Sequence, residues 1–258
     1  MLNAQFPILE FDPSRDVIIS PQHNKKPIKG ISPYCVLCFF NEAIDKFVEK
    51  YPCEIIEHFK ADGGIDKPIY KVNFNGMKIC LTTALLGGPF TAGLLEELHA
   101  LGMNKFLCIG GAGVLNKEIQ HGKLILPTSA IRDEGTSYHY VAPSKELEMN
   151  QKIVELIENY FIQNNIPYIK GKTWTTDGFY RETRQKFERR KAEGCVSVEM
   201  ECASYLAVAQ YNKIDFGQIL YAGDCLDGEK WDRRVQRSLC ADMRYWLLEQ
   251  AMHIIQKF

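Results

Sequence analysis

The chain has 258 residues, of which 46% are hydrophobic and 24% are charged, and its formal net charge is −1. These values are ordinary for a globular protein, and the length suits one large α/β domain or two small ones. The balanced charge gives no reason to expect a nucleic-acid or membrane partner, and no apolar run approaches the length of a membrane span. Residues 1–7 lack the basic and apolar pattern of a signal peptide.

The nine cysteines are an odd number, and most of them lie in apolar segments. This usage favours reduced, buried thiols in a cytoplasmic protein over a disulfide framework. Cys35 and Cys38 have the spacing of a redox or metal pair. They lie in an apolar run with no second pair nearby, so we interpret them as core residues and expect no metal site.

Residues 1–33 are rich in proline and polar residues and are expected to form an irregular arm. From residue 34 on, apolar strand-like runs alternate with helix-like stretches, which is typical of an α/β fold with a sheet between helices. The expected strands are 34–39, 68–74, 77–83, 105–110, 123–126, 168–173, 195–199 and 217–222. The expected helices are 41–51, 91–102, 147–165, 181–193, 201–212 and 232–256.

Asn75 and Gly76 separate two of these strands and predict a hairpin, so we expect a mixed, mostly parallel sheet. The predicted architecture is a single α/β domain over residues 34–258, with a central sheet flanked by helices in three layers.

Glycines follow the predicted strand at 105–110, in the run Gly110, Gly111, Ala112 and Gly113. A glycine-rich turn at a strand end brings backbone amides close to a ligand such as a phosphate or a sugar. The spacing matches neither the dinucleotide fingerprint nor a P-loop. A tight structural turn is the alternative interpretation.

Two polar loops also follow predicted strands. The loop at 130–140 contains Arg132 and many hydrogen-bonding groups, and such loops often line a site, although an exposed loop is the alternative. The loop at 175–180 contains Phe179, an aromatic side chain that could stack on a planar base. Taken alone, Phe179 is more often a core residue.

Glu199, Met200 and Glu201 stand where a predicted strand leads into a helix. Residues i and i+2 of a strand share a face, so both carboxylates could face the crevice where α/β sheets bind small ligands. Acids at the positive end of a helix dipole are the alternative. Asp224 ends the last predicted strand, where it could act as a general acid or cap a turn.

Together these segments resemble the nucleoside phosphorylase family, which includes purine nucleoside phosphorylases, uridine phosphorylases and methylthioadenosine/adenosylhomocysteine nucleosidases. The resemblance runs over roughly residues 34–256. Its most specific part is the run Val198-Glu-Met-Glu201, and the loop at 132–137 is especially like the uridine phosphorylases. The resemblance implies the family's fold, a homo-oligomer (dimer or hexamer), and no cofactor other than phosphate as a co-substrate.

The resemblance also implies roles for single residues. Glu201 would accept hydrogen bonds from the ribose hydroxyls, with Met200 as an apolar wall and Glu199 in support. Phe179 would pack on the base. The remaining positions are Gly111, Ala112, Gly113 and Arg132 at the substrate, and Asp224 as the acid at a purine leaving group. Uridine-specific members read the base with a glutamine and an arginine, and those positions hold Thr183 and Gln185 here, which favours a purine.

The phosphate-binding pattern of the family is altered. Ile44 and Cys108 stand where phosphorylases have arginines, and Gly111 stands where they have a serine or threonine. Each lost charge-assisted hydrogen bond is worth about 1.5–3 kcal/mol, so phosphate binding in the usual way is not expected. Nucleosidases of this fold use a glutamate near the first loop to activate water, and Glu42 lies close to that position. An acid in the first turn of a helix is the alternative, and Arg15, Arg132 or Arg181 are candidates for a rearranged anion site.

The sequence therefore predicts an enzyme that cleaves the N-glycosidic bond of a nucleoside, releasing a free base and either ribose or ribose 1-phosphate. A hydrolytic nucleosidase of the same fold is one alternative. A nucleoside-binding sensor that has lost catalysis is another, although retention of Glu201 and Asp224 argues against it. The missing fingerprint makes a dinucleotide-dependent dehydrogenase a remote third.

Overall fold

The computed structural model describes residues 6–234 and 237–258, and for residues 237–240 it describes the backbone alone. The strands in this part of the chain are β1 (Tyr34–Cys38), β2 (Cys53–Ala61), β3 (Ile65–Phe74), β4 (Met77–Thr83), β5 (Lys105–Val114), β6 (Leu124–Asp133), β7 (Glu146–Glu148), β8 (Tyr168–Thr176), β9 (Cys195–Glu199) and β10 (Asp215–Cys225). The α-helices are α1 (Asn41–Lys50), α2 (Gly88–Leu101), α3 (Gln151–Gln163), α4 (Arg184–Ala192), α5 (Cys202–Asn212) and α6 (Arg237–Ile254).

The strands form one mixed sheet in the order β10-β6-β8-β9-β5-β1-β4-β3-β2, with β7 beside β6. Strand β10 also pairs with β5, so the chain of pairings β5–β9–β8–β6–β10 closes on itself. The hairpin of β3 and β4 forms as expected, with Asn75 and Gly76 in the left-handed conformation that such a turn requires. Among the described residues, five pairings are parallel and five are antiparallel, a more even mixture than the sequence suggested.

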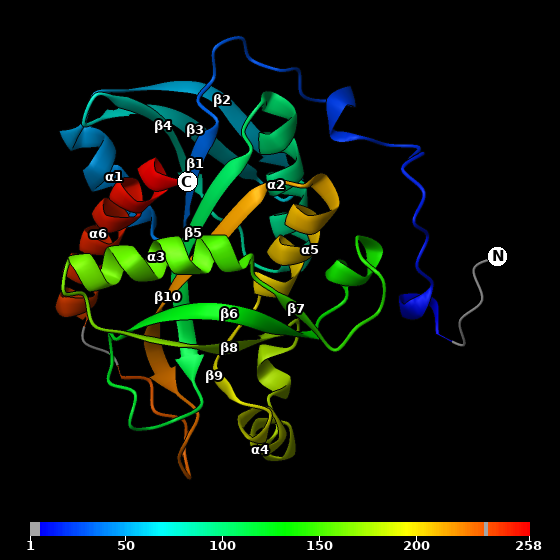
Figure 1. Ribbon diagram of the computed structural model, residues 1–258, viewed down its shortest axis with the longest axis vertical. Helices are drawn as coiled ribbons and strands as arrows, with labels where there is room; N and C mark the ends of the chain where they lie inside the picture. The colour runs from blue at the N-terminus through cyan, green and yellow to red at the C-terminus, as the bar shows by residue number, and fades with distance from the viewer. Residues whose placement is uncertain (1–5, 235–236) are drawn as a thin grey trace.

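Helices cover the sheet on both sides (Figure 1). Helices α1 and α6 pack together on one side, and α2 and α5 pack together on the other. Each α1 residue facing the sheet is apolar: Ala43, Ile44 and Phe47 are buried at helical spacing. Strand β1 is buried on both faces from Cys35 to Cys38, which places its end, and the loop after it, inside the molecule. The expected α/β fold with a mixed sheet between helices is confirmed.

The structure corrects several expected boundaries. Strand β2 and the short β7 were not expected, and the helix predicted over 147–165 begins only at Gln151. The helix predicted from 232 begins at Arg237 among the described residues, and positions 235–236 of that prediction lie outside them. Strand β5 continues to Val114, so the glycines at 110–113 lie within a strand rather than in a turn. None of these three glycines has a positive φ, so no bend in the backbone requires them. A glycine within a strand can instead allow another group to pack close to the backbone.

Residues 6–33 form an irregular arm with two short 3-10 turns, and Figure 1 shows it running along the outside of the molecule. Lys25 lies 3.7 Å from carboxylate oxygens of both Glu57 and Glu97. Arg15 lies over the ring of Tyr211 and donates to its carbonyl oxygen. The arm is therefore packed on the body at several points. Its division from the rest of the chain at residue 33 stays a prediction.

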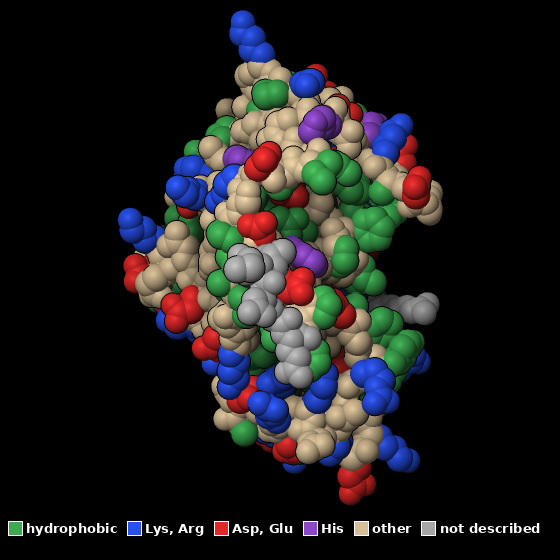
Figure 2. Space-filling view, turned by 90° about the vertical axis from the view of Figure 1, so that its right-hand side faces the viewer, with side chains coloured by type: hydrophobic (Ala, Val, Ile, Leu, Met, Phe, Trp, Pro, Cys, Tyr) green, Lys and Arg blue, Asp and Glu red, His purple; other side chains and the backbone are tan. Residues whose placement is uncertain are grey.

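Acidic and basic side chains lie among one another over the face drawn in Figure 2. Within residues 6–234 and 237–258, no helix is both long enough and apolar enough to cross a membrane. Of the cysteines that the structure describes, all are free and only Cys53 is exposed. Cys35 and Cys38 are fully buried in the core, and burial raises the pKa of Cys38 to about 12. Their interpretation as core residues is confirmed.

Candidate active site

A cavity of about 1160 Å³ lies near the carboxyl ends of β5, β9 and β10. The pairing of Gly113 with Val198 brings the ends of β5 and β9 together, and β10 runs parallel to β5 on its other side. The volume is slightly above the range typical of small-molecule sites, which is about 300–1,000 Å³. Among the predicted site residues, those that line the cavity are Glu42, Gly111, Ala112, Gly113, Phe179, Glu199, Met200, Glu201 and Asp224.

Glu199 is held by the start of helix α5. One of its oxygens accepts hydrogen bonds from the backbone N–H groups of Glu201 (2.8 Å) and Cys202 (2.6 Å). The other accepts the hydroxyl of Thr175 at 2.6 Å, and the Thr175 oxygen in turn accepts the N–H of Ala203 at 3.0 Å. This carboxylate satisfies helix-terminal donors that have no partner within the helix. Both of its oxygens are therefore engaged in positioning the loop that carries Glu201.

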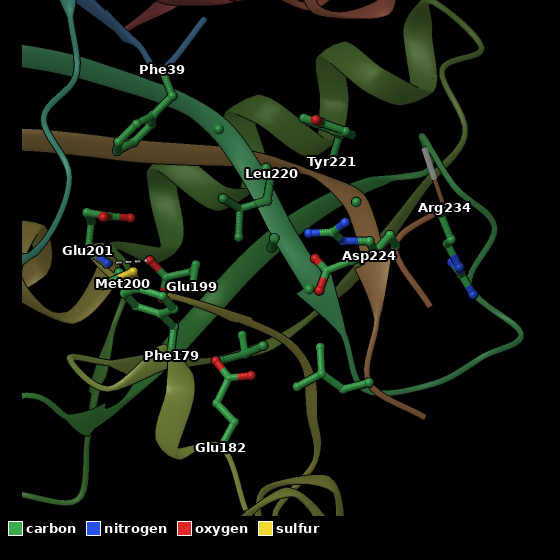
Figure 3. Close-up of a pocket in the computed structure, with 18 of the residues that line it drawn as sticks. Phe39, Phe179, Glu182, Glu199, Met200, Glu201, Leu220, Tyr221, Asp224 and Arg234 are labelled. Carbon is green, nitrogen blue, oxygen red and sulfur yellow. Dashed lines mark hydrogen bonds between the residues drawn. The ribbon is translucent and has the colours of Figure 1, made fainter. Parts of the chain in front are cut away.

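Glu201 has a different environment. One oxygen accepts the N–H of Gly87 at 2.7 Å, and the backbone of Met200 also donates to this carboxylate. Gly87 has a φ of +81°, a left-handed conformation that favours glycine and that turns its N–H toward Glu201. Burial, and next the Glu199 carboxylate, raise the pKa of Glu201. Figure 3 shows Glu201 and Met200 side by side at one end of the cavity.

The glycines of β5 form the floor of the cavity and allow two aromatic rings to approach the strand. A Cβ at Gly110 would lie 2.9 Å from the ring of Phe39, and a Cβ at Gly111 would lie 3.1 Å from the ring of Tyr221. A Cβ at Gly113 would meet Leu226 at 2.7 Å. The sequence correctly placed these glycines at a cavity, but the reason is close packing against a strand and not a turn.

An aromatic side chain and two further acids also line the cavity (Figure 3). Phe179 is 48% exposed and stands on the short 3-10 turn Phe179–Arg181. Asp224 accepts a hydrogen bond from the indole N–H of Trp231 at 2.6 Å. Glu182, which sequence reasoning missed, points into the same space from below Phe179 in Figure 3. Burial and the Asp224 carboxylate raise the pKa of Glu182 to about 7.

A third group consists of Glu42, Arg244 and Tyr221. Arg244, on α6, donates to the carboxylate of Glu42 at 2.9 Å and to the hydroxyl of Tyr221 at 2.9 and 3.1 Å. Its guanidinium lies 4.9 Å from the centre of the Phe40 ring, so it stands beside the loop that follows β1. Sequence reasoning missed Arg244, because a single arginine in an amphipathic helix looks like any other surface residue.

The family profile described as Phosphorylase superfamily matches residues 33–242. The chain belongs to this superfamily. It is 35% identical over 111 residues to the uridine phosphorylase of Thermococcus kodakarensis, an alignment that covers 42% of this chain and 39% of that relative. The matched region thus spans about two fifths of that relative's length.

Solved structures of the superfamily share the fold. A uridine phosphorylase from Vibrio fischeri superposes with a TM-score of 0.74 at 20% identity, covering 90% of this chain and 94% of that one. An AMP nucleosidase from Bacteroides thetaiotaomicron superposes with a TM-score of 0.68 at 23% identity, covering 88% and 89%. The same fold is therefore found in a phosphorylase and in a nucleosidase.

Two of the positions that depart from the phosphorylase pattern lie in the core of the structure. Ile44 is buried on the inner face of α1, and Cys108 is fully buried within β5, so neither position presents a polar group to the cavity. The arginines that do line the cavity come from other elements: Arg184, Arg233, Arg234 and Arg244.

Arg132 does not line the cavity. It is buried, and its guanidinium donates to the hydroxyls of Ser137 (2.8 Å) and Ser144 (2.9 Å) and to the carbonyl oxygens of Ala142 (2.8 Å) and Val141 (3.2 Å). These contacts hold the loop after β6 together. The structure thus contradicts the expectation that Arg132 contacts substrate, because its donors are already used inside the loop. Arg15 and Arg181 do not line the cavity either.

Proposed function

We propose that this protein cleaves the N-glycosidic bond of a purine nucleoside, with water as the acceptor. The observation that carries the proposal is the pairing, within one cavity, of a buried carboxylate (Glu201) and a separate acidic group (Asp224 and Glu182). Cleavage develops positive charge on the ribose and negative charge on the base. Groups that favour each charge at its own end stabilise the transition state more than the substrate.

Glu201 is the proposed ribose ligand. Its carboxylate lines the cavity and can accept hydrogen bonds from the 2′- and 3′-hydroxyls, while the N–H of Gly87 fixes one of its oxygens. Met200 gives the sugar an apolar surface, and Glu199 acts by holding the backbone of Glu201 in place. Gly111, Ala112 and Gly113 of β5 also line the cavity, and there the substrate can come close to the backbone.

The acidic end of the cavity supports a purine over uracil. A purine ring nitrogen is a basic acceptor, and protonation of that nitrogen makes the base a better leaving group. Thr183 and Gln185 do not line the cavity: Thr183 caps α4 by accepting the N–H of Lys186, and Gln185 is exposed. The amide and guanidinium expected for uracil recognition thus have no counterpart at these two positions.

Water is the proposed acceptor because the cavity wall near β1 carries a neutralised pair. Arg244 and Glu42 lie 2.9 Å apart, so together they offer a phosphate dianion no net positive charge. Arg234 is also engaged, by Asp232 at 3.5 Å and by the carbonyl oxygen of Lys117 at 3.1 Å. Glu42 remains the candidate to orient a water molecule, with Arg244 holding it in place.

Exposed apolar side chains support a homo-oligomer. Ile18 and Ile19 of the arm are 97% and 80% exposed, and Leu86 and Tyr180 at the cavity are 66% and 90% exposed. Large exposed apolar groups often mark protein interfaces. We propose a homo-oligomer in the cytoplasm, as the free cysteines suggest, acting without a bound cofactor or metal.

Incubation with a panel of purine and pyrimidine nucleosides tests the proposal. Free base and sugar products are measured by chromatography, with and without inorganic phosphate. We expect purine release at the same rate in both conditions, with ribose as the sugar product. Phosphate-dependent release of ribose 1-phosphate would contradict water as the acceptor. Binding of nucleosides without release of any base would favour a sensor.

A further inference from the structure

The two acids at the base end of the cavity, Glu182 and Asp224, have unequal surroundings. Asp224 accepts the indole N–H of Trp231 at 2.6 Å, so one of its oxygens has a donor. Glu182 is half-buried and has no hydrogen-bond or ion-pair partner within the described part of the chain. Burial without a donor favours the neutral form of a carboxyl group.

The position of Glu182 is fixed by the elements on either side of it. It follows the 3-10 turn that carries Phe179 and immediately precedes Thr183, the N-cap of α4. Figure 3 shows its carboxyl group directed toward the space between Phe179 and Asp224. A base packed against Phe179 would therefore have the Glu182 carboxyl group along its edge.

We propose that Glu182 is the general acid that protonates the leaving base, with Asp224 as the neighbouring carboxyl group. This inference rests on the proposed function and deepens it, because it assigns the proton to a residue that the family resemblance does not mark. Two carboxyl groups whose surroundings differ in this way commonly divide into a proton donor and a charged partner.

The step balances in atoms and charge. The electron pair of the C1′–N bond goes to the base, and the proton on Glu182 passes to a ring nitrogen of that base. The oxygen of a water molecule bonds to C1′ and releases one proton to solvent. Glu182 is left as a carboxylate and takes a proton back from solvent before the next turnover. The products are the neutral base and ribose.

The charged groups around Glu182 define the expected pH dependence. Asp224 faces it from β10, and Arg184 from α4 and Arg233 from the segment after β10 line the same cavity. Arg184 is occupied by the carbonyl oxygen of Gly228. Burial and the Asp224 charge together raise the pKa of Glu182 to about 7. An acid must be protonated to act, so the contribution of Glu182 to the rate should be full below this pH and be lost above it.

The test compares Glu182→Gln with the wild-type chain on two substrates. One is a purine nucleoside, whose base needs a proton to leave. The other is p-nitrophenyl β-D-ribofuranoside, whose phenolate leaves without one. Glu188→Gln is the matched control, because Glu188 lies on the neighbouring helix α4 with a side chain that is 62% exposed. Circular dichroism and thermal unfolding confirm that each variant is folded.

We expect Glu182→Gln to lower kcat on the purine nucleoside about 100-fold or more, the usual effect of losing a general acid. Its kcat on the nitrophenyl riboside should change less than about 3-fold, and the alkaline fall in the purine pH profile should disappear. Glu188→Gln should match the wild type throughout. An unchanged purine rate in Glu182→Gln, or equal losses on both substrates, would overturn the assignment of the proton. If the wild type turned over neither substrate, the proposed function itself would be overturned.

Discussion

Replacement of Glu199 by alanine should destabilise the fold. The substitution removes the acceptor of two backbone N–H groups at the start of α5 and of the Thr175 hydroxyl. Leaving buried donors unpaired costs about 1–3 kcal/mol each, and relief of repulsion from Glu201 offsets part of this, so we expect a net loss of about 3 kcal/mol. For a chain of this size, that loss corresponds to a fall in Tm of about 6–12 °C.

The assay is thermal unfolding followed by circular dichroism or calorimetry. Glu199→Gln is the matched control, because it keeps an oxygen that can accept the two N–H groups, and we expect it to lose about 1 kcal/mol. Glu201→Gln should keep the hydrogen bond from Gly87 and leave the Tm unchanged, while lowering kcat/KM about 10- to 100-fold through its weaker hold on the ribose. A stable Glu199→Ala variant, or a Glu201→Gln variant that loses stability instead of activity, would refute this division of roles.

Further predictions concern the groups around these two carboxylates. Arg132→Ala should lose about 3 kcal/mol of stability, measured by urea unfolding, while its activity per folded molecule stays the same, because its donors serve the loop and not the substrate. Phe179→Ala should raise KM for a purine nucleoside several-fold with a smaller change in kcat, in steady-state assays, since the ring packs on the base. Nucleoside binding should release protons near neutral pH, because ribose hydroxyls favour the charged form of Glu201; calorimetry in buffers of different ionisation enthalpy measures this release. Glu182→Gln should gain stability relative to the wild type as the pH rises from about 4.5 to about 7: the folded wild type binds the Glu182 proton more tightly than the unfolded chain does, so it loses this contribution across that range and the variant does not.

The sequence predicted the parts of the site that lie at ends of strongly apolar strands. Glu199 ends the largely buried β9, with Met200 and Glu201 directly after it. Asp224 lies at the end of β10, where a run of buried residues makes the strand easy to recognise. Their meeting in one cavity follows from the way α/β sheets place strand ends together. The family resemblance already assigned the ribose to Glu201 with Glu199 in support, but the hydrogen bonds by which Glu199 holds the start of α5 required atomic detail, because spacing alone cannot tell a helix cap from a ligand.

The residues missed by sequence reasoning lack such a signal. Glu182 stands between a 3-10 turn and α4, where an acid is ordinary, and only its unpaired, half-buried state distinguishes it. Arg244 is far in sequence from its partners Glu42 and Tyr221, so the ion pair depends on how α6 packs against α1. Strand β2 was missed because its exposed, charged pattern resembles a loop more than a buried strand.

The most direct test of the central claim is the release of free base from a purine nucleoside in phosphate-free buffer, measured by chromatography. The wild-type chain and Glu201→Gln are compared at equal concentrations of folded protein. We predict steady release of purine and ribose by the wild type and a rate at least 10-fold lower for the variant. No release by the wild type, or equal rates for the two proteins, would contradict the proposal that this cavity breaks an N-glycosidic bond with Glu201 at the ribose.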